Sequence, residues 1–176
     1  RASAWYCRSG FYDEALQHAL AAYDTPLAVQ IVVDHFAGWL EQERWRTIER
    51  RLNLLPADIL NQHPWLLMAR GHLLLLQFKW NAVLPLLTRA VERHPADVGL
   101  ASNLARLLVT VEPASHRDPI RALELAVRAN DATGGSDPRT LDTLALALAA
   151  TGRRKDAADA LDAAVALARK SGDVTM

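Results

Sequence analysis

The stretch PWLLMARGHLLLLQFKWNAVLPLLTRAVERHP, from Pro64 to Pro95, decides the fold of this chain. Apolar and small residues recur three and four positions apart on both sides of a break at residues 77–79, which is the periodicity of one face of an α-helix. The chain must reverse at that break, so the stretch predicts two antiparallel helices folded on each other. The residues that mark the two faces are Leu67, Gly71, Leu74, Phe78, Trp80, Val83, Leu87, Ala90 and Pro95.

The spacing of these residues resembles the 34-residue tetratricopeptide (TPR) repeat, a helix–turn–helix unit that stacks on its neighbours. When the same frame is applied to the whole chain, it places one residue of each second helix against the first helix of its pair. From one pair to the next, these residues are 33, 35, 39 and 35 positions apart. These residues are Ala15, Ile48, Val83, Ala122 and Ala157. We therefore predict an all-α chain, a TPR-like right-handed superhelix of about five antiparallel helix pairs. The pairs are expected at roughly 1–23, 25–56, 64–94, 96–133 and 137–172, with a short extra helical segment after Pro56.

Turn and cap residues support these boundaries. Gly10 and Gly152 are expected to end the first helices of pairs one and five in the left-handed conformation. Thr25, followed by Pro26, is expected to cap the second pair, while Asp118 and Asp137 precede prolines at the later helix starts. Five extra residues in the fourth pair fall in VEPASHRDP, residues 111–119, which is either a longer turn at the edge or a ligand loop.

Side-chain size changes along the chain. All five Trp, three Tyr and three Phe lie at or before Trp80, whereas 19 of the 31 alanines follow His94. Trp80 is predicted to be a buried aromatic between helices of the third pair. The last two pairs are expected to pack closely on Ala and Leu.

Composition excludes several classes of protein. The chain has 176 residues, 51% hydrophobic and 23% charged, as expected of a folded chain. Lys plus Arg equals Asp plus Glu at 20 each, with neither half strongly basic, so direct nucleic-acid binding is not expected. The apolar runs are far shorter than the roughly 20 residues of a membrane span. We expect no membrane association and a cytoplasmic location. Because the sequence opens at Arg1 without an initiator Met, we also expect it to be a fragment of a longer protein.

No motif indicates catalysis. The chain has no phosphate-binding loop, and Gly134-Gly135 lies between helices rather than after a strand. The six histidines, at positions 18, 35, 63, 72, 94 and 116, have neither H-x-x-x-H spacing nor a cysteine partner, so no metal site is expected. Cys7, the single cysteine, is interpreted as a buried structural thiol. We predict no enzyme, no catalytic residues and no cofactor.

Three runs resemble a known family. They are EALQHALAA at residues 14–22, RRLNLLP at 50–56 and HPWLLMARGHLLL at 63–75. The region 1–93 resembles the helical-repeat sensor region of large MalT-like, ATP-dependent LuxR-family transcriptional regulators. The resemblance implies a sensor that follows an ATP-binding module and a winged-helix element and precedes a DNA-binding helix-turn-helix, none of which the present sequence matches.

Residues 96–172 resemble a different group. NLARLL at 103–108 and LDTLALALAATGR at 141–153 are typical of TPR repeats at the ends of diverse bacterial proteins. We expect regulator-type repeats with three pairs over 1–94 and TPR repeats with two pairs over 95–176, continuous as one solenoid. A natural fusion, a domain swap by recombination and an engineered chimera all remain open.

The function predicted from this combination is a non-catalytic, ligand- or protein-binding module, the sensor or scaffold region of a bacterial transcriptional regulator. The alternative is a generic TPR adaptor, or a chimeric repeat protein, with no sensing role. The expected partner is a protein or peptide, or a small-molecule effector, held in a concave groove; self-association is a further expectation.

The first helix of each pair should line that groove. Its outward positions are Val33 and Ala37 in pair two, Trp65, Met68 and His72 in pair three, Ser102 and Arg106 in pair four, and Arg139 and Asp142 in pair five. The Arg106 guanidinium could bind a ligand carboxylate or phosphate through charge-assisted hydrogen bonds in its forked geometry. The alternative is that Trp65 and Met68 pack under residues 57–62 and Arg106 is a solvated surface charge.

Overall fold

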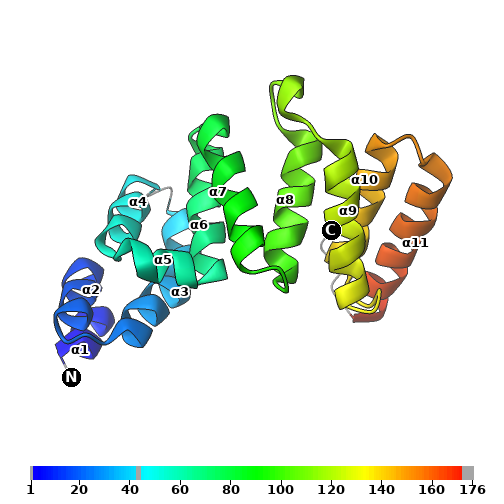
Figure 1. Cartoon of the computed structure of the whole chain (residues 1–176). Coiled ribbons are helices and arrows are strands. Elements are labelled where there is room, and N and C mark those ends of the chain that lie inside the picture. Colours follow the sequence, from blue (N-terminus) through cyan, green and yellow to red (C-terminus); the bar gives the residue numbers. More distant parts are fainter. Residues whose placement is uncertain (1, 43–44, 172–176) are drawn as a thin grey trace. The chain divides into compact units, whose positions relative to one another are not determined.

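The computed structural model describes residues 2–42 and 45–171, and all the elements it describes are helices. Figure 1 shows their order along the chain. The elements are α1 Ala2–Arg8, α2 Tyr12–Ala21, α3 Thr25–Glu41, α4 Trp45–Leu54, α5 Ala57–Gln62, α6 Pro64–Leu76, α7 Trp80–Arg93, α8 Val98–Thr110, the 3₁₀ turn Ala114–His116, α9 Pro119–Ala132, α10 Pro138–Ala150 and α11 Arg154–Ser171.

These helices fall within the predicted pairs. Helices α1 and α2, α3 and α4, α8 and α9, and α10 and α11 contact each other as the predicted pairs require. Helices α6 and α7 occupy the range of the predicted third pair, and their packing on each other stays a prediction. Helix α5 is the expected extra segment before the third pair. The predicted end of the last pair, residue 172, lies outside the described residues. The prediction of an all-α, TPR-like chain is therefore confirmed.

The chain divides into two compact units, Arg1–Lys79 and Trp80–Met176. The first contains α1 to α6, and the second contains α7 to α11. The helices of the sequence stretch from Pro64 to Pro95 thus belong to different units. The predicted boundary between residues 94 and 95 concerns the resemblance of the repeats, and it stays a prediction.

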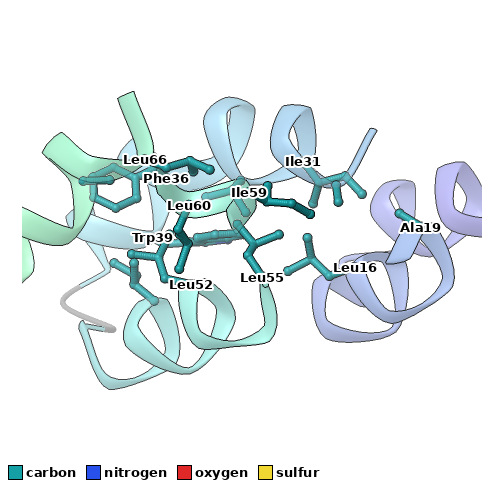
Figure 2. Packing of buried hydrophobic residues seen from close by; sticks show 14 of the residues in the cluster. Leu16, Ala19, Ile31, Phe36, Trp39, Leu52, Leu55, Ile59, Leu60 and Leu66 are labelled. Carbon is teal, nitrogen blue, oxygen red and sulfur yellow. The ribbon is translucent and has the colours of Figure 1, made fainter. Parts of the chain in front are cut away.

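The first unit has one hydrophobic core formed by large side chains. Leu16 of α2, Ile31 of α3 and Leu52 of α4 converge with buried residues of α5 and α6, as Figure 2 shows. Trp39, only 3% exposed, lies within this core. Trp39 and Phe36 are the buried aromatic residues of this core and fill space that smaller residues would leave open.

Small residues dominate the packing of the second unit. Helices α8, α9 and α10 contact one another, and α10 also contacts α11. The buried alanines that allow this approach are Ala101, Ala105, Ala122, Ala126, Ala129, Ala145, Ala147, Ala164 and Ala168. Leu100, Leu104 and Val111 fill the remaining interior, each 0% exposed. The expected change from aromatic to Ala and Leu packing is confirmed.

The residue that the repeat frame marks on each second helix is buried. Four of the five residues that it places against the first helix are 0% exposed and the last is 9% exposed: Ala15, Ile48, Val83, Ala122 and Ala157. Two other expectations were wrong. Phe78 is 77% exposed because it lies in the turn after α6, and Trp80, the first residue of α7, is half-buried rather than fully buried.

Aspartates cap several helices. Asp118 and Asp137 accept hydrogen bonds from the backbone N–H groups of Arg121 and Arg139, as predicted. The expectation for Thr25 was wrong, because Thr25 is the first residue of α3 and Asp24 is its cap. The Asp24 carboxylate accepts from the Leu27 N–H at 3.1 Å. A carboxylate at this position also interacts favourably with the helix dipole.

The extra residues of the fourth pair form a closed turn. Arg117 Nε donates to the Val111 carbonyl at 3.0 Å, and the same guanidinium forms an ion pair with Glu112. The Asp118 N–H donates to the Leu108 carbonyl of α8 at 2.9 Å. These contacts close the turn onto α8 and lead directly into α9, although the buried Nδ1 of His116 has no hydrogen-bond partner among the described residues.

Helices α2 and α6 end in a left-handed residue that is not glycine. Tyr23 has φ +56°, its N–H donates to the Leu20 carbonyl, and the Asp24 N–H donates to the Ala19 carbonyl. This is the Schellman arrangement, in which glycine is preferred because a Cβ is strained there. The Tyr23 side chain is 93% exposed and gains little from packing.

The substitution Tyr23→Gly should therefore stabilise the protein by about 0.5–1 kcal/mol, since it relieves the left-handed strain. Gly10→Ala is the matched opposite change, because Gly10 has φ +79° and open space where a Cβ would lie. It should destabilise by about 1 kcal/mol. Urea unfolding of both variants measures the difference, and changes of the same sign would contradict the assignment.

Candidate binding face on the first helices

The predicted binding residues lie on the first helices of four pairs, α3, α6, α8 and α10. In the first unit α3 contacts α6, and in the second α8 contacts α10, so that first helices of successive pairs are neighbours within each unit. Trp65, Met68 and His72 belong to the first unit, and Ser102, Arg106, Arg139 and Asp142 belong to the second. A groove joining the two groups remains a prediction.

In the first unit the predicted residues are partly committed to packing. The Trp65 ring lies edge to face with Phe36 of α3, with ring centroids 5.2 Å apart. Trp65 and Met68 are half-buried, as is Val33 of α3. His72 is exposed, as is Ala37. Trp65 therefore contributes to the joint between α3 and α6, and His72 is the predicted polar residue that faces solvent.

In the second unit two predicted residues form an ion pair across neighbouring helices. Arg106 Nη1 of α8 donates to Asp142 Oδ2 of α10 at 2.5 Å. The side chains are 50% and 33% exposed. Arg106 is thus not a lone solvated charge, because a carboxylate of the same chain contacts it, and its role in binding a ligand anion stays a prediction.

The two other predicted residues flank this pair. Ser102 lies about one turn before Arg106 on α8, and its Oγ is buried without a hydrogen-bond partner among the described residues. Arg139 lies one turn before Asp142 on α10 and is exposed. The α8–α10 face, defined here as Ser102, Arg106, Arg139 and Asp142, is therefore polar, with its central charges neutralised.

Sequence reasoning missed a charged cluster in the first unit. Arg51 Nε donates to Asp13 Oδ1 at 2.6 Å, and Arg50 pairs with the same carboxylate. The Arg51 guanidinium carbon lies 4.2 Å from the centroid of the Trp39 ring and 5.1 Å from that of Tyr12. Cation–π contact and a charge-assisted hydrogen bond together hold a buried cation among α2, α3 and α4. The partners are too far apart in sequence for a local motif to reveal them.

The substitution Asp13→Asn should destabilise the protein by about 1–3 kcal/mol, because it leaves the Arg51 guanidinium without its charged partner. The side chain of Arg51 is 9% exposed, so solvent cannot replace that partner fully. Arg50→Ala is the control: the Arg50 side chain is 63% exposed, and its loss should change stability by less than about 0.5 kcal/mol. Equal losses in thermal unfolding would contradict a special role for Arg51.

The thiol of Cys7 has little chemical reactivity at neutral pH. Burial raises the pKa of the Cys7 thiol, and the negative charge of Asp34 raises this pKa further. The thiolate, which is the reactive form, is therefore scarce at neutral pH.

Among residues 2–42 and 45–171, no group of three or more His, Cys, Asp or Glu side chains is placed to hold a metal ion. Within the same residues, no helix has the length and apolar character to cross a membrane.

Alkylation of Cys7 should be slow at pH 7 and should accelerate as the pH rises. Asp34→Asn removes one of the two causes that raise the thiol pKa, so the reaction should then reach its half-maximal rate at a lower pH. Rates with iodoacetamide across a pH series measure this shift. An unchanged pH profile would mean that burial alone controls the thiol.

Comparison with solved structures supports the helical-repeat class. A crystal structure of MamA aligns with a TM-score of 0.66 at 13% sequence identity, covering 98% of both chains. A structure of MamA from residue 41 onward, from Desulfovibrio magneticus RS-1, aligns with a TM-score of 0.61 at 20% identity, covering 96% of this chain and 92% of that one. At these identities the likeness shows the fold alone.

Comparison with curated proteins indicates a more specific relationship. The chain is 36% identical over 120 residues to the HTH-type transcriptional regulator MalT of Vibrio campbellii. The aligned region covers 64% of this chain and 13% of that protein. It is 30% identical over 100 residues to MalT of Klebsiella pneumoniae, covering 57% and 11%. No protein-family model matches the chain. The resemblance to MalT-like regulators is confirmed, and the chain spans only a small part of their length.

Proposed function

We propose that this chain is the protein-interaction or effector-binding region of a bacterial transcriptional regulator. The similarity to MalT regulators supports the regulatory role, and the TPR-like fold supports binding rather than catalysis. A regulator that acts on transcription works in the cytoplasm, which is the location we propose. The rest of such a regulator would supply DNA binding, because the basic and acidic residues of this sequence are equal in number.

The α8–α10 face is the proposed binding surface in the second unit. The observation that carries this proposal is the half-exposed pair of Arg106 and Asp142, which offers polar groups at the centre of the first-helix face. Exposed His72 marks the corresponding face of α6 in the first unit. Either face could contact a protein, a peptide or a small effector through side chains that the core does not require.

The second candidate is an adaptor with no sensing role. It is favoured by the extent of the sequence similarity, which reaches 64% of this chain and not all of it. The coding sequence on both sides of this chain separates the two candidates. An upstream phosphate-binding loop and a downstream helix-turn-helix would support the regulator, and their absence would support the adaptor.

A matched pair of charge reversals tests the proposed surface. Arg139→Glu changes an exposed residue of the α8–α10 face, whereas Arg128→Glu makes the same change on the second helix α9, where Arg128 is also exposed. Calorimetry against a panel of peptides, nucleotides and small effectors identifies a binder. Arg139→Glu should weaken its affinity by about tenfold, and Arg128→Glu should leave it unchanged. Equal effects of the two substitutions would remove the site from this face.

A further inference from the structure

Four aromatic rings gather where α1 packs on α2 in the first unit (Figure 1). The rings of Trp5 and Phe11 are nearly parallel, with an interplanar angle of 18° and centroids 6.4 Å apart. The Tyr6 ring is almost perpendicular to both, at 76° and 86°, and the exposed His18 ring stacks on Tyr6 at 5.0 Å. Trp5 and Phe11 are each more than half exposed, so much of their ring surface stays in contact with solvent.

A carboxylate lies on the same side of α2 as two of these rings. Phe11, Glu14 and His18 are three and four residues apart, so their side chains project from one side of the helix. Glu14 is exposed, and it forms no ion pair with any residue that the structure describes. The surface therefore combines open ring faces with an available carboxylate, and both attract a cation.

The same unit already holds an arginine with this combination of groups. The Arg51 guanidinium carbon lies 4.2 Å from the centroid of the Trp39 ring and 5.1 Å from that of the Tyr12 ring. Its Nε donates to the Asp13 carboxylate at 2.6 Å. A tryptophan, a second ring and a carboxylate thus hold a guanidinium in the interior, and α1 and α2 present the same three groups at the surface.

The chemistry of these groups favours arginine over lysine. A guanidinium is planar and weakly hydrated, so it can stack on an aromatic ring while its N–H groups donate to a carboxylate. A lysine ammonium is a strongly hydrated point charge, and contact with a ring would remove part of its water. Within the described part of the chain, no Lys or Arg lies over the ring of Trp5 or Phe11, the exposed Arg8 of α1 included.

We propose that the α1–α2 aromatic surface, defined here as Trp5, Tyr6, Phe11 and Glu14, binds an arginine side chain of a partner protein. The guanidinium would stack on the exposed rings and donate to the Glu14 carboxylate. This inference goes beyond the α8–α10 face, because the surface belongs to the other unit and uses none of the residues of that face.

Capped tripeptides test the surface without the natural partner. The probes are Gly-Arg-Gly, Gly-Lys-Gly and the same peptide with citrulline, which is planar like arginine but uncharged. The arginine peptide should bind at least about threefold more tightly than the lysine peptide and at least about tenfold more tightly than the citrulline peptide. The indole and amide NMR signals of α1 and α2 measure binding.

Variants assign the binding to the proposed groups. Trp5→Leu and Glu14→Gln should each weaken binding of the arginine peptide by about two- to fivefold, since each removes one exposed contact with the cation. Trp45→Leu is the matched control at another exposed tryptophan, where Arg46 already lies 5.0 Å from the ring centroid, and it should leave binding unchanged. Thermal unfolding confirms that each variant is folded, and Glu14→Gln decides the test if Trp5→Leu unfolds.

Equal binding of the arginine and citrulline peptides, or of the arginine and lysine peptides, would overturn the inference. An affinity that survives both Trp5→Leu and Glu14→Gln would overturn it as well. Self-association of the parent chain that Trp5→Leu abolishes would assign the surface to a second copy and would also overturn the inference. The proposed function would stand in each case, because the charge reversals at Arg139 and Arg128 test it separately.

Discussion

The burial of one small or aliphatic residue on each second helix is the constraint that the five predicted pairs share. The residue of the second helix at this position is almost completely buried in every pair. It is an alanine in α2 and α9 and the larger isoleucine in α4. Since interiors are packed as densely as organic crystals, the size of this residue determines what its neighbours can be.

The two units meet that constraint with different side chains. In the first unit Trp39 and Phe36 supply large surfaces, and the buried Arg51 stacks between Trp39 and Tyr12 with Asp13 as its charged partner. Such a cation is tolerated in an interior only when its charge is paired and its donors are used. In the second unit alanines shorten the distance between helices, so that each helix contributes less apolar area than an aromatic one would. Aromatic packing and cation–π contact thus contribute to the stability of the first unit, whereas packing of small side chains predominates in the second.

The proposed binding surface consists of side chains that the core does not require. Arg106 and Asp142 lie on helices whose opposite sides are buried, so the packing of α8 and α10 fixes both backbones without requiring either charge. A half-exposed ion pair contributes about 0.2–1 kcal/mol to stability, too little to explain its position as a structural requirement. The same pair is well suited to recognition, because rigid helices hold a donor and an acceptor at a fixed separation.

The sequence by itself determined the helical-repeat class and the similarity to MalT-like regulators. Periodic burial needs only residues three and four apart, so the positions of Ile48, Val83 and Ala122 could be read locally. The cap residues could be predicted from the sequence nearly as well. The exception is α3, which is capped by Asp24 rather than Thr25, because either residue type can cap a helix. The seven candidate binding residues could be assigned to first helices by the same periodicity.

Only the tertiary structure decided which side chains meet. The contact between Arg106 and Asp142 joins residues 36 positions apart, and that between Asp13 and Arg51 joins residues 38 apart. Helix periodicity gives the direction of a side chain around its own axis, but it does not give the rotation and offset of the neighbouring helix. For that reason the ion pair of Arg106 was not among the two roles expected for it, and the buried Arg51 was not predicted at all.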